Sequence, residues 1–194
     1  MLRLTTLALL LCTLAGVAAA ESRVDITPSL AWFNPTKDVI DQDGITANYA
    51  PGLAYGARLS IWLNETVSLD VSGHYGRTTM DGNIMGEEGS LDMALFYGSA
   101  QIAVAMGKEQ RLTLHGGVGM QGTNYDEFIE GSNIMTGVVG VSGVAPLGEN
   151  TWLRADADLH LHTAYFELDG YQTDELTQND WVLAVGIMFR SGGE

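Results

Sequence analysis

The chain has few cysteines, prolines and basic residues, and each shortage excludes a class of protein. Its 194 residues include one cysteine, Cys12, which lies in the apolar N-terminal segment, so the rest of the chain is not held together by disulfides. Only four prolines occur, and no low-complexity stretch indicates a linker, which favours a single domain. With nine basic and 24 acidic residues, the chain is not expected to bind nucleic acid or an anionic inner leaflet.

Residues 1–20 have the pattern of a secretory signal that is removed after export. Arg3 precedes an apolar run from Leu7 to Val17, and three alanines at 18–20 precede Glu21, as at an A-x-A cleavage site. Leucines precede Cys12, where a lipoprotein signal would have small residues. Removing Arg3 from the nine basic residues leaves eight against 24 acidic ones. The sequence therefore predicts one exported, acidic domain over residues 21–194.

Long apolar runs are also missing after residue 20. No later stretch reaches the roughly 18 apolar residues of a membrane helix, which excludes a helical membrane protein. Apolar residues alternate instead, most clearly at Trp181, Leu183, Val185, Ile187 and Phe189, which have mostly smaller residues between them. A period of two indicates a strand. Nine residues with an aromatic at each end suit a tilted strand that crosses a bilayer, which needs about 9 to 11 residues.

Seven further segments are strand-like, and most of them alternate in the same way. The eight predicted strands cover residues 23–33, 52–63, 66–76, 91–106, 111–121, 134–145, 152–166 and 181–189. In the fourth segment the apolar residues lie at odd positions in the first half and at even positions in the second half. We place the even-numbered residues outward, with a bulge near residues 97–99 as the alternative. The sixth segment is small and apolar on both faces, so its phase stays open.

The connections between these strands alternate in length. Three are short (64–65, 107–110 and 146–151), and four are long and polar (34–51, 77–90, 122–133 and 167–180). Outer-membrane barrels have this asymmetry, with short periplasmic turns and long outer loops, and lipid does not tolerate an open sheet edge. The predicted fold is an all-β, eight-stranded antiparallel transmembrane β-barrel with both termini on the periplasmic side. A soluble barrel such as a lipocalin-like fold is the alternative.

Aromatic residues gather near the strand ends, where amphipathic rings would lie at the membrane interfaces. The predicted interface aromatics are Trp32, Trp62, Tyr75, Trp152, Trp181 and Phe189. With the signal, the strand count and the loop alternation, they make the chain resemble the small eight-stranded outer-membrane barrels of Gram-negative bacteria, the OmpA-, OmpX- and OmpW-like group. One departure is that residues 190–194 follow Phe189, whereas the group usually ends on its terminal aromatic.

Charged residues and histidines share the opposite parity and would point into the barrel. They are Arg58, Asp70, His74, Arg111, His115, Arg154, Asp156, Asp158, His160 and His162. An eight-stranded barrel has an interior that side chains about fill, and buried charges must be paired, so we predict a polar core of mutually satisfied groups. A metal site at Asp156, Asp158, His160 and His162 is the alternative. The prediction includes no catalytic residue, no cofactor and no metal.

Acidic residues dominate the long connections. They are Asp38, Asp41, Asp43, Asp81, Glu87, Glu88, Asp126, Glu127, Glu130, Glu167, Asp169, Asp174, Glu175 and Asp180. A solvated surface explains them, and binding of divalent cations at a lipopolysaccharide surface is the alternative. Residues 41–44, Asp-Gln-Asp-Gly, match only the start of an EF-hand loop.

The predicted function is that of an integral outer-membrane protein with a structural, adhesive or surface-interaction role and no catalysis. Its expected partners are outer-membrane lipid, lipopolysaccharide and the barrel-assembly machinery. One alternative is a narrow channel for small or hydrophobic solutes, as the OmpW-like resemblance implies. Another is a lipid A-modifying enzyme; deacylases of the PagL kind have a histidine and a serine two residues apart on one strand, but here His160 is followed by His162 and then Ala164.

Overall fold

Strands make up nearly all of the described chain. The computed structural model describes residues 23–36, 40–42, 45–84, 86–107, 109–125, 133–164, 167–168, 171–172 and 176–191, so the predicted signal lies outside it. The strands are β1 (Val24–Pro35), β2 (Ile40–Gln42), β3 (Ile45–Tyr49), β4 (Gly52–Trp62), β5 (Val67–Ile84), β6 (Glu87–Met106), β7 (Leu112–Tyr125), β8 (Asn133–Pro146), β9 (Thr151–Ala164), β10 (Glu167–Leu168), β11 (Tyr171–Gln172) and β12 (Leu176–Ser191). Within these ranges no helix is long and apolar enough to cross a membrane.

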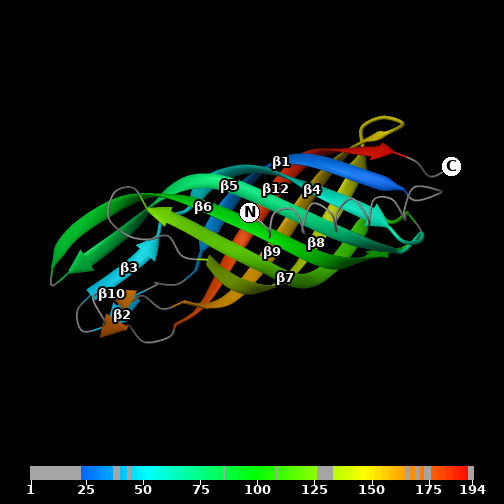
Figure 1. The fold of residues 1–194 in the computed structure, drawn as a ribbon. Helices are drawn as coiled ribbons and strands as arrows, with labels where there is room; N and C mark the ends of the chain where they lie inside the picture. Colours follow the sequence, from blue (N-terminus) through cyan, green and yellow to red (C-terminus); the bar gives the residue numbers. More distant parts are fainter. Residues whose placement is uncertain are drawn as a thin grey trace, which may run out of the picture.

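Eight of the strands form a closed ring. β1, β4, β5, β6, β7, β8, β9 and β12 pair in that order, each antiparallel to the next. β12 returns to pair with β1, with Ile26 opposite Phe189 and Leu30 opposite Val185. The result is the tilted barrel of Figure 1, and it confirms the predicted all-β antiparallel fold. The strand 181–189 has the predicted place as the one that closes the ring.

The outer wall of the barrel is apolar. Leu53 is 69% exposed and Leu30 is 65% exposed, although both are large aliphatic residues. Their neighbours along the chain alternate with them, and Asp25 and Thr27 on β1 are each only 1% exposed, inside the ring. A polar interior within an apolar wall is the reverse of a water-soluble barrel, so the wall requires lipid around it.

The two strands with uncertain phase are both regular. β6 pairs with β5 without interruption from Val104 opposite Val67 to Glu87 opposite Ile84, so the proposed bulge is wrong and the outward even-numbered face is confirmed. In β8 the even-numbered residues face inward, with Thr136 and Ser142 buried.

Apolar residues on the inward face of β6 explain why its pattern was ambiguous. Met93, Leu95 and Tyr97 lie inside the barrel, in one buried cluster with Phe33 and Val182. Part of the interior is therefore apolar, and there both faces of a strand carry hydrophobic residues.

The connection 77–90 was predicted as a loop, and this is wrong. β5 and β6 continue through it as strands to a turn at Gly86, which has a φ of 95°. β3 pairs with this part of β5, with Tyr49 opposite Met80, and the three strands make an extended sheet (residues 45–49, 78–84 and 87–93). It projects beyond the ring at the end opposite the finish of β12, seen at the left of Figure 1. We call this the extended end and the other, with the short turns, the turn end.

The extended sheet has one apolar and one polar face. Its inward residues, among them Ala47, Tyr49 and Met80, pack on the buried apolar cluster at the extended end. β3 and β4 are separated at residues 50–51, where Pro51 has no N–H to donate to a neighbouring strand. The pairing of β4 with β1 ends just after this break, with Phe33 opposite Gly52. A recess of about 310 Å³ lies where β1 and β3 diverge.

Candidate functional site

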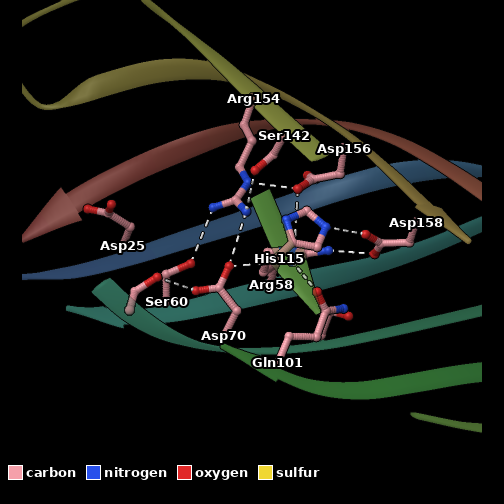
Figure 2. A network of polar contacts seen from close by, with 12 residues as sticks. Asp25, Arg58, Ser60, Asp70, Gln101, His115, Ser142, Arg154, Asp156 and Asp158 are labelled. Atoms are coloured by element: carbon pink, nitrogen blue, oxygen red, sulfur yellow. Dashed lines mark hydrogen bonds and ion pairs between the residues drawn. The ribbon is translucent and has the colours of Figure 1, made fainter. Parts of the chain in front are cut away.

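Arg58 lies at the centre of a polar network that crosses the interior of the barrel. Its Nη2 donates to Asp158 Oδ2 at 2.5 Å, and its Nη1 lies 3.4 Å from Asp70 Oδ2. Its Nε is 3.4 Å from Asp156 Oδ1. Figure 2 shows these side chains converging from β4, β5 and β9. Because β4 and β9 are not neighbours in the ring, Arg58 bridges the lumen rather than lying along one wall.

Arg154 makes the second bridge. Its Nε donates to Asp156 at 2.9 Å, and its Nη2 donates to Asp70 and to Ser142, both at 3.2 Å. Its Nη1 donates to Ser60 at 3.2 Å. These contacts join β9 to β4, β5 and β8. Arg58 also contacts Gln101 on β6 at 3.5 Å. The two guanidinium groups therefore connect five of the eight barrel strands through charge-assisted hydrogen bonds.

His115 adds a further contact to the network. Two arginines face three carboxylates, and the third carboxylate, Asp158, also contacts His115, whose Nε2 lies 2.5 Å from Oδ1. The side chains of this pair are 0% and 4% exposed. Taking so many charges out of water is unfavourable unless each has partners, and here each carboxylate contacts at least one arginine. The buried charges of the network therefore depend on one another for their partners.

Gly140 on β8 provides the room for this pair. A Cβ at this position would overlap His115 Nε2, Asp158 Oδ1 and the backbone oxygen of Ala157. Because those atoms belong to the network and to the backbone, a larger residue could not be accommodated by a side-chain rotation alone.

A second polar group closes the turn end. Asp25, 1% exposed, accepts hydrogen bonds from Arg23 at 2.9 Å, Arg190 at 3.2 Å and Trp62 Nε1 at 2.8 Å. Arg23 lies over the Trp62 ring at 3.9 Å, and Arg190 lies over the Trp152 ring at 4.7 Å. Arg190 belongs to the residues that follow the terminal aromatic, and its contact with Asp25 joins the last strand to the first.

A third polar group lies next to the apolar cluster. Tyr97 donates its hydroxyl to Asp180 Oδ2 at 3.0 Å, and its ring packs edge-on against His160 at 4.9 Å. His160 Nδ1 contacts Thr136 at 3.1 Å, and His162 Nε2 is 3.8 Å from Asp180. Asp180 was predicted on an acidic loop; this is wrong, because it lies on β12 and faces the interior with 1% exposure.

The structure places nine of the ten predicted interior residues inside the barrel. They are Arg58, Asp70, His74, His115, Arg154, Asp156, Asp158, His160 and His162. Arg111 is the exception and the prediction for it is wrong: it precedes β7, its side chain is 56% exposed, and it pairs with Glu109 at 2.7 Å in the turn. Residues at a turn no longer follow the parity of the strand.

Three of the four interior histidines, His74, His115 and His160, have a hydrogen-bond partner, and neither ring nitrogen of His162 has one within the part of the chain that the structure describes. His74 contacts Ser29 on β1 at 3.0 Å. Among the described residues, no group of three or more histidine and acidic side chains is arranged to hold a metal ion. Two residues of the alternative metal site, Asp156 and Asp158, contact Arg58 and Arg154.

The predicted interface aromatics divide into two groups. Trp32, Tyr75, Trp181 and Phe189 lie on the outer wall. For Trp62 and Trp152 the prediction is wrong, since both have the inward parity of their strands and contact arginines at the turn end. The predicted set of interface aromatics lacks Tyr55 and Phe96, which are exposed on the outer wall beside Tyr75 and which strand parity places there. It also missed Asp25, Gln101 and Tyr97 among the interior polar residues.

An apolar outer wall, a closed ring of eight antiparallel strands and a charged interior together define a small β-barrel that spans a membrane. The model of the family described as "Outer membrane protein beta-barrel domain" matches residues 4–189, and the chain belongs to this family. It is an outer-membrane protein.

Solved structures show the same fold at low sequence identity. OprG from Pseudomonas aeruginosa is 14% identical, with 89% of this chain and 97% of that chain covered and a TM-score of 0.62. AlkL, solved in lipid bilayers, is 12% identical, with 89% and 90% covered and a TM-score of 0.57. Outer membrane protein W of E. coli is 13% identical, with 89% and 100% covered and a TM-score of 0.52. No curated protein matches the chain.

Proposed function

We propose that this barrel does not conduct solutes and that it acts through the surface at its extended end, in a structural, adhesive or surface-interaction role. The observation that carries the proposal is the network of Arg58 and Arg154 across the lumen. A permeating ion or solute would have to separate buried ion pairs, and removing one partner of such a pair costs about 3–5 kcal/mol.

The apolar cluster in the interior supports the same proposal. Phe33 and Tyr97 pack at 5.1 Å between ring centroids, and the cavity beside them holds only about 10 Å³. One water molecule needs a cavity of at least about 10–15 Å³, so this space is far too small for a hydrophobic solute. The alternative of a channel for such solutes would require this cluster to separate.

A second part of the proposal is that the barrel has no catalytic role. His160 and His162 are 3% and 6% exposed and lie inside the ring, so an acyl ester of a membrane lipid does not reach them from the outer wall. Mass analysis of lipid A from cells with and without the protein tests this point. Loss of an acyl chain only in cells that contain the protein would make it an enzyme.

The proposal includes an orientation. We infer that the turn end, where β1 begins and β12 finishes, faces the periplasm and that the extended end faces the outside, because short turns are typical of the periplasmic side. Export through residues 1–20, insertion by the barrel-assembly machinery and contact with lipopolysaccharide are expectations of the same proposal.

Conductance across a planar bilayer tests the closed lumen. The wild-type protein is expected to show no discrete openings. A variant with Arg58→Ser and Arg154→Ser is expected to show them, because the two bridges across the lumen are gone. Arg111→Ser is the matched control: it removes an exposed arginine and should stay silent. Discrete openings of the wild-type protein would support the channel alternative instead.

A further inference from the structure

The outer wall changes from apolar to polar at Arg77. Below it, Tyr55, Tyr75 and Phe96 form an exposed aromatic group at neighbouring register positions, and the rings of Tyr55 and Tyr75 lie 5.8 Å apart. Arg77 is the next outward residue of β5 after Tyr75, with Leu53 and Ala94 on either side. Aromatic rings favour the headgroup level of a membrane, so Arg77 lies where the lipid headgroups begin.

Every outward side chain beyond Arg77 on the extended sheet is polar. These are Thr46 and Asn48 on β3, Thr79, Asp81 and Asn83 on β5, and Glu88, Ser90 and Asp92 on β6. A shallow groove of about 510 Å³ runs over most of them, lined by Thr46, Asn48, Asp81, Gly82, Asn83, Glu88, Gly89 and Ser90. It shares Asn48 and Asp81 with the 310 Å³ recess beside β1, so the two make one furrow across the outer wall.

The furrow is held in place by hydrogen bonds within the sheet. Asp81 Oδ1 accepts from Thr79 at 3.1 Å and from Ser90 at 2.9 Å. Asn83 Oδ1 accepts from the backbone N–H of Gly86 at 2.8 Å in the turn. Asn48 lies opposite Asp81 in the β3–β5 pairing. Side chains already fixed in this way lose little conformational freedom when a ligand binds.

We propose that this furrow binds the saccharide part of lipopolysaccharide from the protein's own membrane, with Arg77 facing a phosphate of the lipid headgroup. The inference rests on the proposed function, since it requires the extended end to face outside. Two observations carry it. The furrow lies on the same outer face as the lipid-facing wall, with Thr79 between Arg77 and Asp81 on β5, and its amide, hydroxyl and carboxylate groups match the hydroxyl groups of a sugar chain.

The charges on the wall fit the two parts of this ligand. Among the described residues, Arg77 is the only arginine or lysine exposed on the outer wall at the extended end, so it is the place for an anionic headgroup. The furrow itself contains Asp81 and Glu88 and no basic residue, which disfavours a phosphate there and favours neutral sugar hydroxyls.

The test compares two ligands on the full-length protein in detergent micelles. Native mass spectrometry measures retention of lipopolysaccharide that carries its core saccharide and of lipid A that lacks it. The wild-type protein should retain the core-bearing form about tenfold better, and Asn48→Leu and Thr46→Val should each reduce that preference about threefold, as expected for loss of one hydrogen bond. Arg77→Gln should weaken both ligands equally. Asp92→Asn, outward on the same sheet but outside the furrow, should change nothing.

Three outcomes would overturn the inference. The first is equal retention of both ligands by the wild-type protein, and the second is a preference for the core-bearing form that Asn48→Leu leaves intact. The third is a preference that a chelator abolishes although Asn48→Leu has no effect on it. The last would mean a cation bridge to Asp81 and Glu88 instead of sugar contacts. Heat-modifiable gel migration of each variant separates loss of binding from loss of folding. A barrel that conducts but keeps the core preference would refute the closed lumen of the proposed function and leave its orientation, on which this inference rests, untouched.

Discussion

Replacing Arg58 by methionine should destabilise the barrel more than any substitution of an exposed arginine. Methionine keeps much of the buried volume, but it removes the cation that contacts Asp70, Asp156 and Asp158. Those carboxylates stay buried, with only Arg154 and His115 to face them. Breaking a buried pair in this way costs about 3–5 kcal/mol, and we expect a loss of that size in the free energy of unfolding.

Urea unfolding in lipid vesicles, followed by tryptophan fluorescence and by heat-modifiable gel migration, measures this loss. Arg111→Met is the control, and its expected effect is within about 0.5 kcal/mol because Arg111 is exposed. Adding Asp158→Asn to Arg58→Met should recover part of the loss, with an interaction energy of about 0.5–3 kcal/mol.

Two results would refute this reasoning. One is an Arg58→Met variant as stable as Arg111→Met. The other is strict additivity of Arg58→Met and Asp158→Asn, which would mean that the two side chains do not interact in the folded protein.

Three further substitutions test other parts of the interior in the same unfolding assay. Arg190→Gln leaves Asp25 with one arginine instead of two, and since the Arg190 side chain is 21% exposed we expect a loss of about 1 kcal/mol; an unchanged protein would mean that this contact does not help to close the ring. Trp62→Phe removes the N–H that donates to Asp25 and should lower the free energy of unfolding by about 1.5–3 kcal/mol. A Trp62 side chain in the membrane interface would tolerate phenylalanine, so an unchanged stability would contradict its inward position. Gly140→Ala forces a methyl group into the contact between His115 and Asp158 and should lower the free energy of unfolding by about 1–3 kcal/mol. Gly89→Ala is its control, because a Cβ there meets nothing within 4 Å. Equal effects of the two substitutions would contradict the crowding at Gly140.

The alternation of residues predicts the barrel well because each face of a strand has one kind of neighbour over most of its length. Lipid lies outside and polar side chains lie inside, so period two is visible in β1, β5 and β9. It fails in β6, where Met93 and Leu95 face an apolar interior and both faces look alike. The alternation also does not predict the extended sheet, because residues 77–90 are rich in polar residues and resemble a loop.

The candidate site shows the limits of a pattern along one strand. Parity alone brings Arg58 and Asp158 inside, but it does not show that they meet across the lumen, since their contact depends on the shear and diameter of the closed ring. Trp62 was misplaced for a different reason. The general preference of aromatics for the interface and the parity of the strand predict different positions for Trp62, and the structure agrees with parity.

Solvent exchange of the arginine guanidinium protons in the folded protein tests the closed lumen most directly. In ¹⁵N spectra of the protein in lipid, the Nε–H signals of Arg58 and Arg154 should persist and exchange with water far more slowly than that of Arg111, because the first two are buried in ion pairs and the third is exposed. Exchange of all three at similar rates would mean a water-filled lumen and would contradict the account.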